Sequence, residues 1–193
     1  MSDCSNNTLQ VHDLLKCVSM SDTTPGYVNL EKLISEELPT SVHNRFCPHG
    51  SKCYSGNRID ISSIEILPKP INTAFDMINE KDECILFHGT PLKNISSILS
   101  QGLRPECCID PGFGVGVYMT PCLKLARGFI SGDGGVFVCR VKLGVCKIFH
   151  DGDPNYVRED QNSNRLGDEF VIYETSRIRP IMLLRFQSDF GPK

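Results

Sequence analysis

The chain lacks the features that mark a membrane-spanning or secreted protein. No apolar run in its 193 residues approaches the roughly 18 that suggest a transmembrane helix. The segment from Met1 to Asn7 has neither the basic nor the apolar region of a signal peptide. We therefore expect a soluble protein of the cytoplasm, the nucleus or both, with no membrane partner.

A strong excess of charge is also missing. The net charge is −3 and the pI is about 5.9, so the whole chain exerts no general attraction on nucleic acid. Internal repeats and low-complexity tracts are absent. Hydrophobic residues make up 40% of the chain and charged residues 22%, a balance typical of a globular protein. A length of 193 residues suffices for one domain or for one domain with an appendage.

Ten cysteines are more than average, but they are scattered. Cys84 and Cys139 lie inside apolar strand patterns, where a reduced thiol behaves as a small hydrophobic side chain. Without a signal peptide, we expect thiols rather than a disulfide framework.

The spacing of apolar residues divides the chain into three parts. Residues 1–25 are polar and predict a flexible arm, and residues 26–80 form an N-terminal segment with a helix and one alternating strand. Residues 81–190 are densely patterned with short strands and two helices, and residues 150–167 within them read as a polar loop. About six strands with few long helices predict an α+β fold with a largely antiparallel core.

Cys47, His49 and Cys53 lie within seven residues, a density of thiolate and imidazole that can hold zinc. The segment resembles the first half of a poly(ADP-ribose)-binding zinc finger. However, no histidine follows Cys53 until His88, so the second pair of ligands is missing locally. We favour a glycine turn between buried cysteines, with zinc as the alternative.

Three polar side chains stand at the ends of predicted strands. His88 follows an apolar run in His-Gly-Thr, Tyr118 follows Gly114-Val115-Gly116-Val117, and Glu169 opens Glu-Phe-Val-Ile-Tyr. Each alone is more often structural than catalytic. Together, in this order, they resemble the His-Tyr-Glu triad of ADP-ribosyltransferases of the poly(ADP-ribose) polymerase and diphtheria-toxin group.

That resemblance extends from Ile85 to Phe186 and implies the ADP-ribosyltransferase-like fold, with largely antiparallel sheets forming an NAD cleft. It implies NAD+ as the substrate and transfer of ADP-ribose to a macromolecular acceptor, protein rather than nucleic acid. It gives Tyr118 the role of stacking on nicotinamide and Glu169 that of binding the ribose and stabilising its cationic transition state.

The other implied contacts to NAD+ surround these three residues. His88 would orient the adenosine ribose by donating a hydrogen bond to it. The backbone of Gly89 would bind the carboxamide of nicotinamide, and Thr90 and Arg104 would contact the adenosine end.

Two positions depart from the family pattern. Ala126 stands where active polymerases usually have a serine that contacts the nicotinamide amide, and Phe129 stands in place of a tyrosine wall. The 51 residues from Tyr118 to Glu169 leave little room for the insertions of processive polymerases, so we expect mono-ADP-ribosylation. A catalytically silent binding domain of the same fold is the alternative.

A third reading, from another class, is an RNA phosphate transferase on the related fold. That chemistry needs cationic side chains clustered around a phosphate, and Arg104, Arg127 and Arg140 are the candidates. Neither the oligomeric state nor the identity of the acceptor follows from the sequence.

Overall fold

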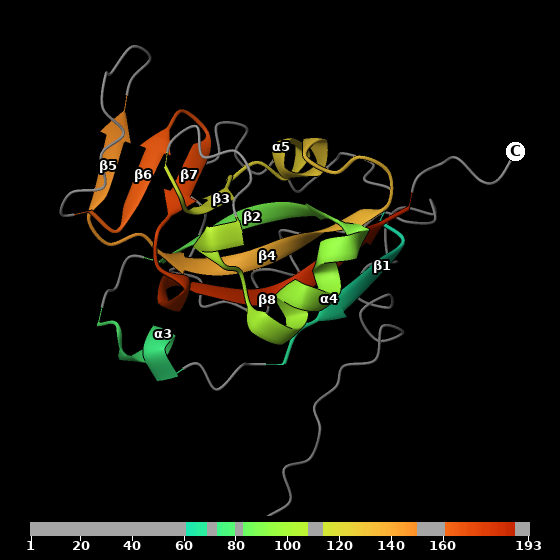
Figure 1. The fold of residues 1–193 in the computed structure, drawn as a ribbon, viewed down its shortest axis with the longest axis horizontal. Coiled ribbons are helices and arrows are strands. Elements are labelled where there is room, and N and C mark those ends of the chain that lie inside the picture. The colour runs from blue at the N-terminus through green and yellow to red at the C-terminus, as the bar shows by residue number, and fades with distance from the viewer. Residues whose placement is uncertain (1–60, 69–72, 80–82, 108–113, 150–160, 188–193) are drawn as a thin grey trace, which may run out of the picture.

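The fold is α+β with two mostly antiparallel sheets, as the sequence predicts (Figure 1). A computed structural model of the chain describes residues 61–68, 73–79, 83–107, 114–149 and 161–187. The first sheet has the spatial order β1 (Ser63–Ile66), β8 (Ile178–Phe186), β4 (Gly134–Lys142) and β2 (Glu83–Pro91). All three of its strand pairs are antiparallel.

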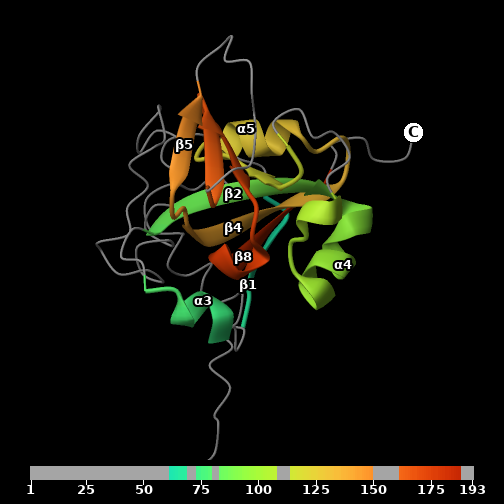
Figure 2. The same ribbon diagram turned by 60° about the vertical axis from the view of Figure 1, so that its left-hand side comes forward.

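The second sheet stands beside the first, at the end where β2 and β4 extend beyond β1 (Figures 1 and 2). Its order is β3 (Val117–Met119), β7 (Glu169–Ile172), β6 (Ser163–Leu166) and β5 (Cys146–Phe149). The β5–β6 pair is parallel, whereas β3–β7 and β6–β7 are antiparallel.

Short helices connect the strands. The described residues form α3 (Thr73–Met77), α4 (Leu92–Gln101) and α5 (Leu123–Gly128), with 3-10 turns at Pro105–Cys107 and Thr175–Arg177. None of the helices in this part of the chain is long and apolar enough to cross a membrane. Helix α4 ends at Gly102, whose φ of 78° is left-handed, as the sequence predicts for a C-cap glycine.

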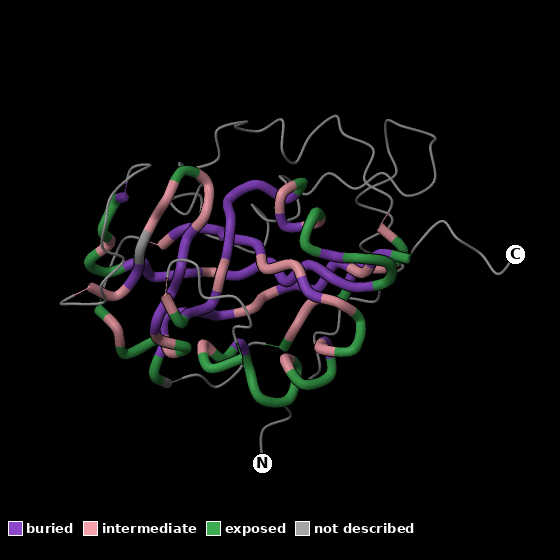
Figure 3. Tube along the Cα trace, turned by 45° about the horizontal axis from the view of Figure 1, so that its top comes forward, coloured by how far each residue is buried: buried purple, intermediate pink, exposed green. Residues whose placement is uncertain are grey.

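Alternate residues of β2 bury their side chains in two separate clusters, because neighbouring side chains of a strand point to opposite faces. Ile85 and Phe87 pack with α5. Cys84 and Leu86 pack with Ile95 of α4 and with the second sheet. Most buried positions therefore follow the central strands, while the outer turns of the helices are exposed (Figure 3). The five cysteines in the described part of the chain form no disulfide.

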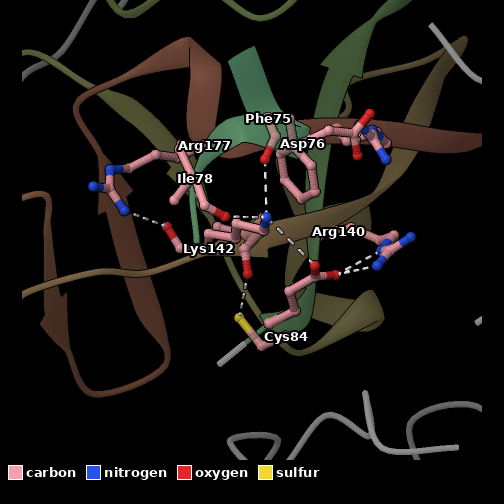
Figure 4. Close-up of polar contacts among 10 residues, drawn as sticks. Phe75, Asp76, Ile78, Cys84, Arg140, Lys142 and Arg177 are labelled. Carbon is pink, nitrogen blue, oxygen red and sulfur yellow. Dashed lines mark hydrogen bonds and ion pairs between the residues drawn. The ribbon is translucent and has the colours of Figure 1, made fainter. Parts of the chain in front are cut away.

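Helix α3 is fixed to the first sheet by a buried lysine (Figure 4). The Nζ of Lys142 donates hydrogen bonds to the carbonyl oxygens of Phe75 and Ile78, at 2.9 and 2.8 Å. The same Nζ lies 4.5 Å from the centre of the Phe75 ring and 3.8 Å from a carboxylate oxygen of Glu83. This contact joins α3 to the start of β2 and the end of β4.

Consequently, the first sheet and its core include residues that precede position 80. β1 pairs with β8, and Ile64 and Phe75 are buried. Residues 1–60 lie outside the described part of the chain, so the predicted arm and the predicted domain limits stay predictions.

The interpretation of residues 150–167 as a loop is wrong at its end, where Ser163–Leu166 form β6. The strand has few aliphatic residues, because pairing with β5 and β7 on its two sides stabilises it. The hydroxyl of Ser163 adds a hydrogen bond to the carbonyl oxygen of Leu143 at 2.8 Å. Gly167, with a φ of 55°, and Asp168 form the two-residue turn into β7.

Candidate active site

A cavity of about 680 Å3 opens between β2, β3 and α4 and is lined by all of the predicted site residues except Ala126. His88, Tyr118 and Glu169 come from β2, β3 and β7, and all three line this cavity. Four more predicted residues line it: Gly89, Thr90, Arg104 and Phe129. Three strands that lie far apart in the sequence thus bring side chains to one space, with His88 and Tyr118 inside their strands and Glu169 at the start of its own.

The cavity begins where β2 and β3 separate. Phe87 and Thr120 exchange two backbone hydrogen bonds, of 2.7 and 3.0 Å, at an isolated bridge between the two sheets. Backbone groups two residues apart in a strand point the same way. The N–H and C=O of Gly89 therefore also point away from β4, into the gap beyond the bridge. A ligand amide in this gap would meet one donor and one acceptor of the backbone.

The imidazole of His88 is held against β3. Its Nδ1 lies 2.9 Å from the backbone carbonyl oxygen of Tyr118. Burial lowers the pKa of His88 below its usual 6.5, and the hydrogen bond to the Tyr118 carbonyl opposes this shift only in part. At neutral pH the ring is uncharged. Because a carbonyl oxygen can only accept, Nδ1 carries the proton and Nε2 is an acceptor, so His88 would accept a ribose hydroxyl rather than donate to one.

Tyr118 is fixed by its own hydroxyl, which donates to the carbonyl oxygen of Gly114 at 3.0 Å. This bond spans the glycine turn that leads into β3 and holds the ring at the cavity wall. Glu169 is the first residue of β7, the strand that pairs with β3. The residue after it, Phe170, lies opposite Met119, which follows Tyr118. The side chain of Glu169 is half-buried and lines the cavity. Tyr118 and Glu169 thus enter the cavity from adjacent strands.

Gly89 is required by close packing as well as by any ligand. A Cβ on this residue would lie only 1.9 Å from the carbonyl oxygen of Ala126 in α5. Ala126 is fully buried on the core side of α5 and is not among the residues that line the cavity. The predicted contact of Ala126 with a ligand stays a prediction. In the structure, the backbone of Ala126 packs against Gly89.

The α4 side of the cavity carries polar groups that the sequence analysis missed. Asn94 lines the cavity and donates from Nδ2 to the hydroxyl oxygen of the buried Thr90, at 3.3 Å. Ser97 follows one helical turn later on the same wall. A spacing of three residues places Asn94 and Ser97 on the same face of α4. The sequence does not tell which face of α4 meets the cavity, so this spacing alone could not identify them as site residues.

Arg104 and Phe129 lie at the exposed parts of the wall. The guanidinium Nε of Arg104 is 3.8 Å from Glu106, and its side chain is 40% exposed. Phe129, which follows α5, is 57% exposed and its ring is available to a ligand.

The three arginines of the RNA-transferase hypothesis are not brought together. Arg140 pairs with Glu83 through Nε at 2.7 Å. Arg127 donates to the carbonyl oxygen of Ile130 and lies over the Phe186 ring. Only Arg104 of the three lines the cavity, so the described residues offer no arginine cluster for a phosphate there.

Nothing in the described part of the chain groups three histidine, cysteine, aspartate or glutamate side chains in a way that could hold a metal ion. Cys47, His49 and Cys53 lie outside the described residues, so the choice between a zinc site and a turn stays open there.

Comparison with known proteins agrees with this geometry. Residues 48–165 match the poly(ADP-ribose) polymerase catalytic domain, a range that holds more than half of the chain and ends before Glu169. The chain therefore belongs to the poly(ADP-ribose) polymerase catalytic domain family. Its fold is that of the family, as the sequence resemblance implies.

Two curated relatives carry the same name, protein mono-ADP-ribosyltransferase PARP4. The mouse protein is 30% identical over 130 residues, and the human protein is 28% identical over 141 residues. These alignments cover 53% and 55% of this chain but only 7% and 8% of the relatives. The chain thus corresponds to a small part of much longer proteins.

Proposed function

We propose that this domain transfers ADP-ribose from NAD+ to a protein acceptor, one unit at a time, and releases nicotinamide. The observation that carries the proposal is the convergence of His88, Tyr118 and Glu169, from three strands, on one cavity. Family membership supports the use of NAD+. A cavity of about 680 Å3 is within the roughly 300–1,000 Å3 range of small-molecule sites.

The proposed reaction breaks the bond between the ribose and the nicotinamide nitrogen. Nicotinamide leaves with the bonding electron pair and becomes neutral, while positive charge develops on the ribose. A nucleophilic atom of the acceptor forms the new bond to the ribose carbon and loses its proton to solvent. The carboxylate of Glu169 would stabilise the charge on the ribose and bind a ribose hydroxyl.

The remaining residues position the substrate. Tyr118, held by Gly114, would present its ring to nicotinamide, with Phe129 on the opposite side. The outward N–H and C=O of Gly89 would bind the carboxamide. The Nε2 of His88 would accept a hydroxyl of the adenosine ribose, beside Thr90 and Arg104.

Transfer of single units is favoured over polymer synthesis by two observations. The two curated relatives are named as mono-ADP-ribosyltransferases. In addition, Glu169 follows Tyr118 by only 51 positions in the sequence, which limits the insertions available to hold a growing chain.

A silent NAD-binding domain is the second candidate, because Ala126 lacks the serine hydroxyl that the family pattern would supply at this place. Incubation with NAD+ labelled in the adenosine separates the two. We expect labelled protein and released nicotinamide with the wild type and neither with Glu169→Gln. The matched control is Glu65→Gln, which removes a carboxylate of β1 that pairs with Arg185 at 3.2 Å, outside the cavity.

The outcomes distinguish the candidates. Binding of NAD+ without nicotinamide release would favour the silent domain. Absence of both binding and release in the wild type would reject both NAD-based readings. Release that persists in Glu169→Gln would remove Glu169 from the chemistry.

A further inference from the structure

Arg104 is the cationic side chain in the wall of the cavity. Among the described residues that line this cavity, only Arg104 and Glu169 carry a charge at neutral pH, since burial keeps His88 uncharged. The substrate of the proposed reaction has its negative charge on a diphosphate, next to the adenosine ribose. Because Glu169 would bind the other ribose, Arg104 is the charged side chain of this wall that can attract the diphosphate.

A carboxylate of the chain already lies next to this cation. Oε1 of Glu106 is 3.8 Å from Nε of Arg104. The 3-10 turn Pro105–Cys107, which directly follows Arg104, brings the two side chains together. The N–H of Cys107 closes the turn with a 3.1 Å hydrogen bond to the carbonyl oxygen of Arg104. The local fold therefore places a negative charge beside the cation that a diphosphate would need.

The pair of Arg104 and Glu106 is weak enough for a ligand to displace. A separation of 3.8 Å is longer than a normal hydrogen bond, and the two side chains are 40% and 67% exposed. Exposed ion pairs contribute little free energy, because water and salt screen them. A phosphate in the cavity, by contrast, can accept charge-assisted hydrogen bonds from a guanidinium. Glu106 is not among the residues that line the cavity, so its carboxylate would act on a ligand there through Arg104.

We infer that Glu106 is a positioning residue that competes with the diphosphate of NAD+ for Arg104 and so weakens the binding of NAD+. In the free protein Arg104 pairs with Glu106. In the complex Arg104 pairs with the diphosphate, and the carboxylate of Glu106 returns to water. Breaking the pair costs free energy that opposes binding of the diphosphate and leaves binding of nicotinamide unchanged. The inference rests on the proposed function, since it requires the diphosphate in this cavity.

Removal of the competing charge tests the inference. Glu106→Gln keeps the size of the side chain and removes its charge, and Arg104→Gln removes the cation. Both single variants and the double variant are titrated calorimetrically with ADP-ribose and, separately, with nicotinamide, which has no phosphate. Thermal unfolding is recorded for each variant. The matched control is Glu65→Gln, because Glu65 forms a similarly exposed pair with Arg185 at 3.2 Å, outside the cavity.

We expect Glu106→Gln to strengthen ADP-ribose binding about two- to fivefold, the effect of one exposed ion pair, with nicotinamide affinity within about twofold of the wild type. In the double variant the substitution of Glu106 should add nothing to the effect of Arg104→Gln, because Glu106 acts through Arg104. In turnover of labelled NAD+, Glu106→Gln should lower KM and leave kcat unchanged. Glu65→Gln should change neither affinity.

Unchanged or weaker ADP-ribose binding in Glu106→Gln would overturn the inference. An equal gain with and without Arg104 would also overturn it, because Glu106 would then act on the ligand directly. If the wild type binds ADP-ribose but releases no nicotinamide, the proposed transfer fails, and the calorimetric comparison still decides whether Glu106 competes for Arg104. If the wild type binds neither ligand, the proposed function and this inference both fail.

Discussion

The Nδ1 of His88 donates its proton to the backbone carbonyl oxygen of Tyr118, over 2.9 Å, and so connects β2 to β3 at the mouth of the gap between them. One residue before His88 the two strands are joined by the Phe87–Thr120 bridge, and beyond it they separate. Where the cavity begins, the side chain of His88 therefore holds β2 to β3 in place of backbone hydrogen bonds. This arrangement makes the protonation state of His88 relevant to stability as well as to binding.

The first prediction concerns pH. Because burial lowers the folded-state pKa of His88 below 6.5, the unfolded chain binds a proton at higher pH than the folded protein does. The contribution of His88 to the free energy of unfolding should therefore be fully present above pH 6.5. It should be lost as the pH falls from 6.5 toward the folded-state pKa. Urea unfolding at several pH values measures it. In His88→Gln this part of the pH dependence should disappear, and parallel curves for the two proteins would contradict the assignment.

The second prediction concerns the packing of β2 against α5. Gly89→Ala would place its Cβ 1.9 Å from the carbonyl oxygen of Ala126, and backbone atoms cannot move aside cheaply. We expect a loss of about 2–4 kcal/mol in the free energy of unfolding, from strain and displacement of α5. Denaturant unfolding with Gly128→Ala provides the control, since a Cβ at Gly128 would meet nothing within 4 Å.

Gly128→Ala should be neutral or stabilising by up to about 1 kcal/mol, because alanine lowers the entropy of the unfolded chain. Similar effects of the two substitutions would show that the contact between Gly89 and Ala126 is not tight.

These cases show what could be read from the sequence and what could not. A strand that carries His88, the C-cap at Gly102 and the α+β class follow from local patterns and are present in the structure. The predicted end of the strand at His88 is wrong, because β2 continues to Pro91 through its pairing with β4. The need for glycine at position 89 was predicted for access to a ligand. Its steric cause, the Ala126 carbonyl, depends on how α5 crosses β2, which no local pattern encodes.

The missed parts share a physical reason. β6 has few aliphatic residues because Ser163 and its backbone bonds, rather than an apolar face, hold it between β5 and β7. Asn94 was missed because its neighbours in the sequence are unremarkable. It becomes informative only when its hydrogen-bond partner and the cavity are known.

The third prediction concerns the attachment of α3. Lys142→Met removes two hydrogen bonds to the carbonyl oxygens of Phe75 and Ile78 and leaves Glu83 without one of its cations. We expect a loss of about 2–4 kcal/mol, since buried polar groups that lose their partners retain their desolvation cost. Hydrogen exchange should accelerate in residues 73–79 more than in β3.

Lys147→Met is the control for the removal of a lysine, because Lys147 is exposed on β5. It should change the free energy of unfolding by less than about 0.5 kcal/mol. Equal effects of the two lysine substitutions would refute a specific role of Lys142 in holding α3.

The fourth prediction separates the ring of Tyr118 from its hydroxyl. The hydroxyl donates to the carbonyl oxygen of Gly114 at 3.0 Å and so orients the ring without itself being aimed at a ligand. If the ring stacks on nicotinamide, Tyr118→Phe keeps the stacking surface and loses only the orienting bond. We expect kcat/KM for nicotinamide release to fall about 3- to 10-fold in Tyr118→Phe, the effect of one hydrogen bond. Tyr118→Ala removes the aromatic face and should lower kcat/KM by at least about 100-fold, because the reacting bond is then poorly positioned.

Thermal unfolding of both variants shows whether each remains folded. Equal losses in the two variants would mean that the hydroxyl takes part in the reaction directly, and stacking would then not be the role of Tyr118.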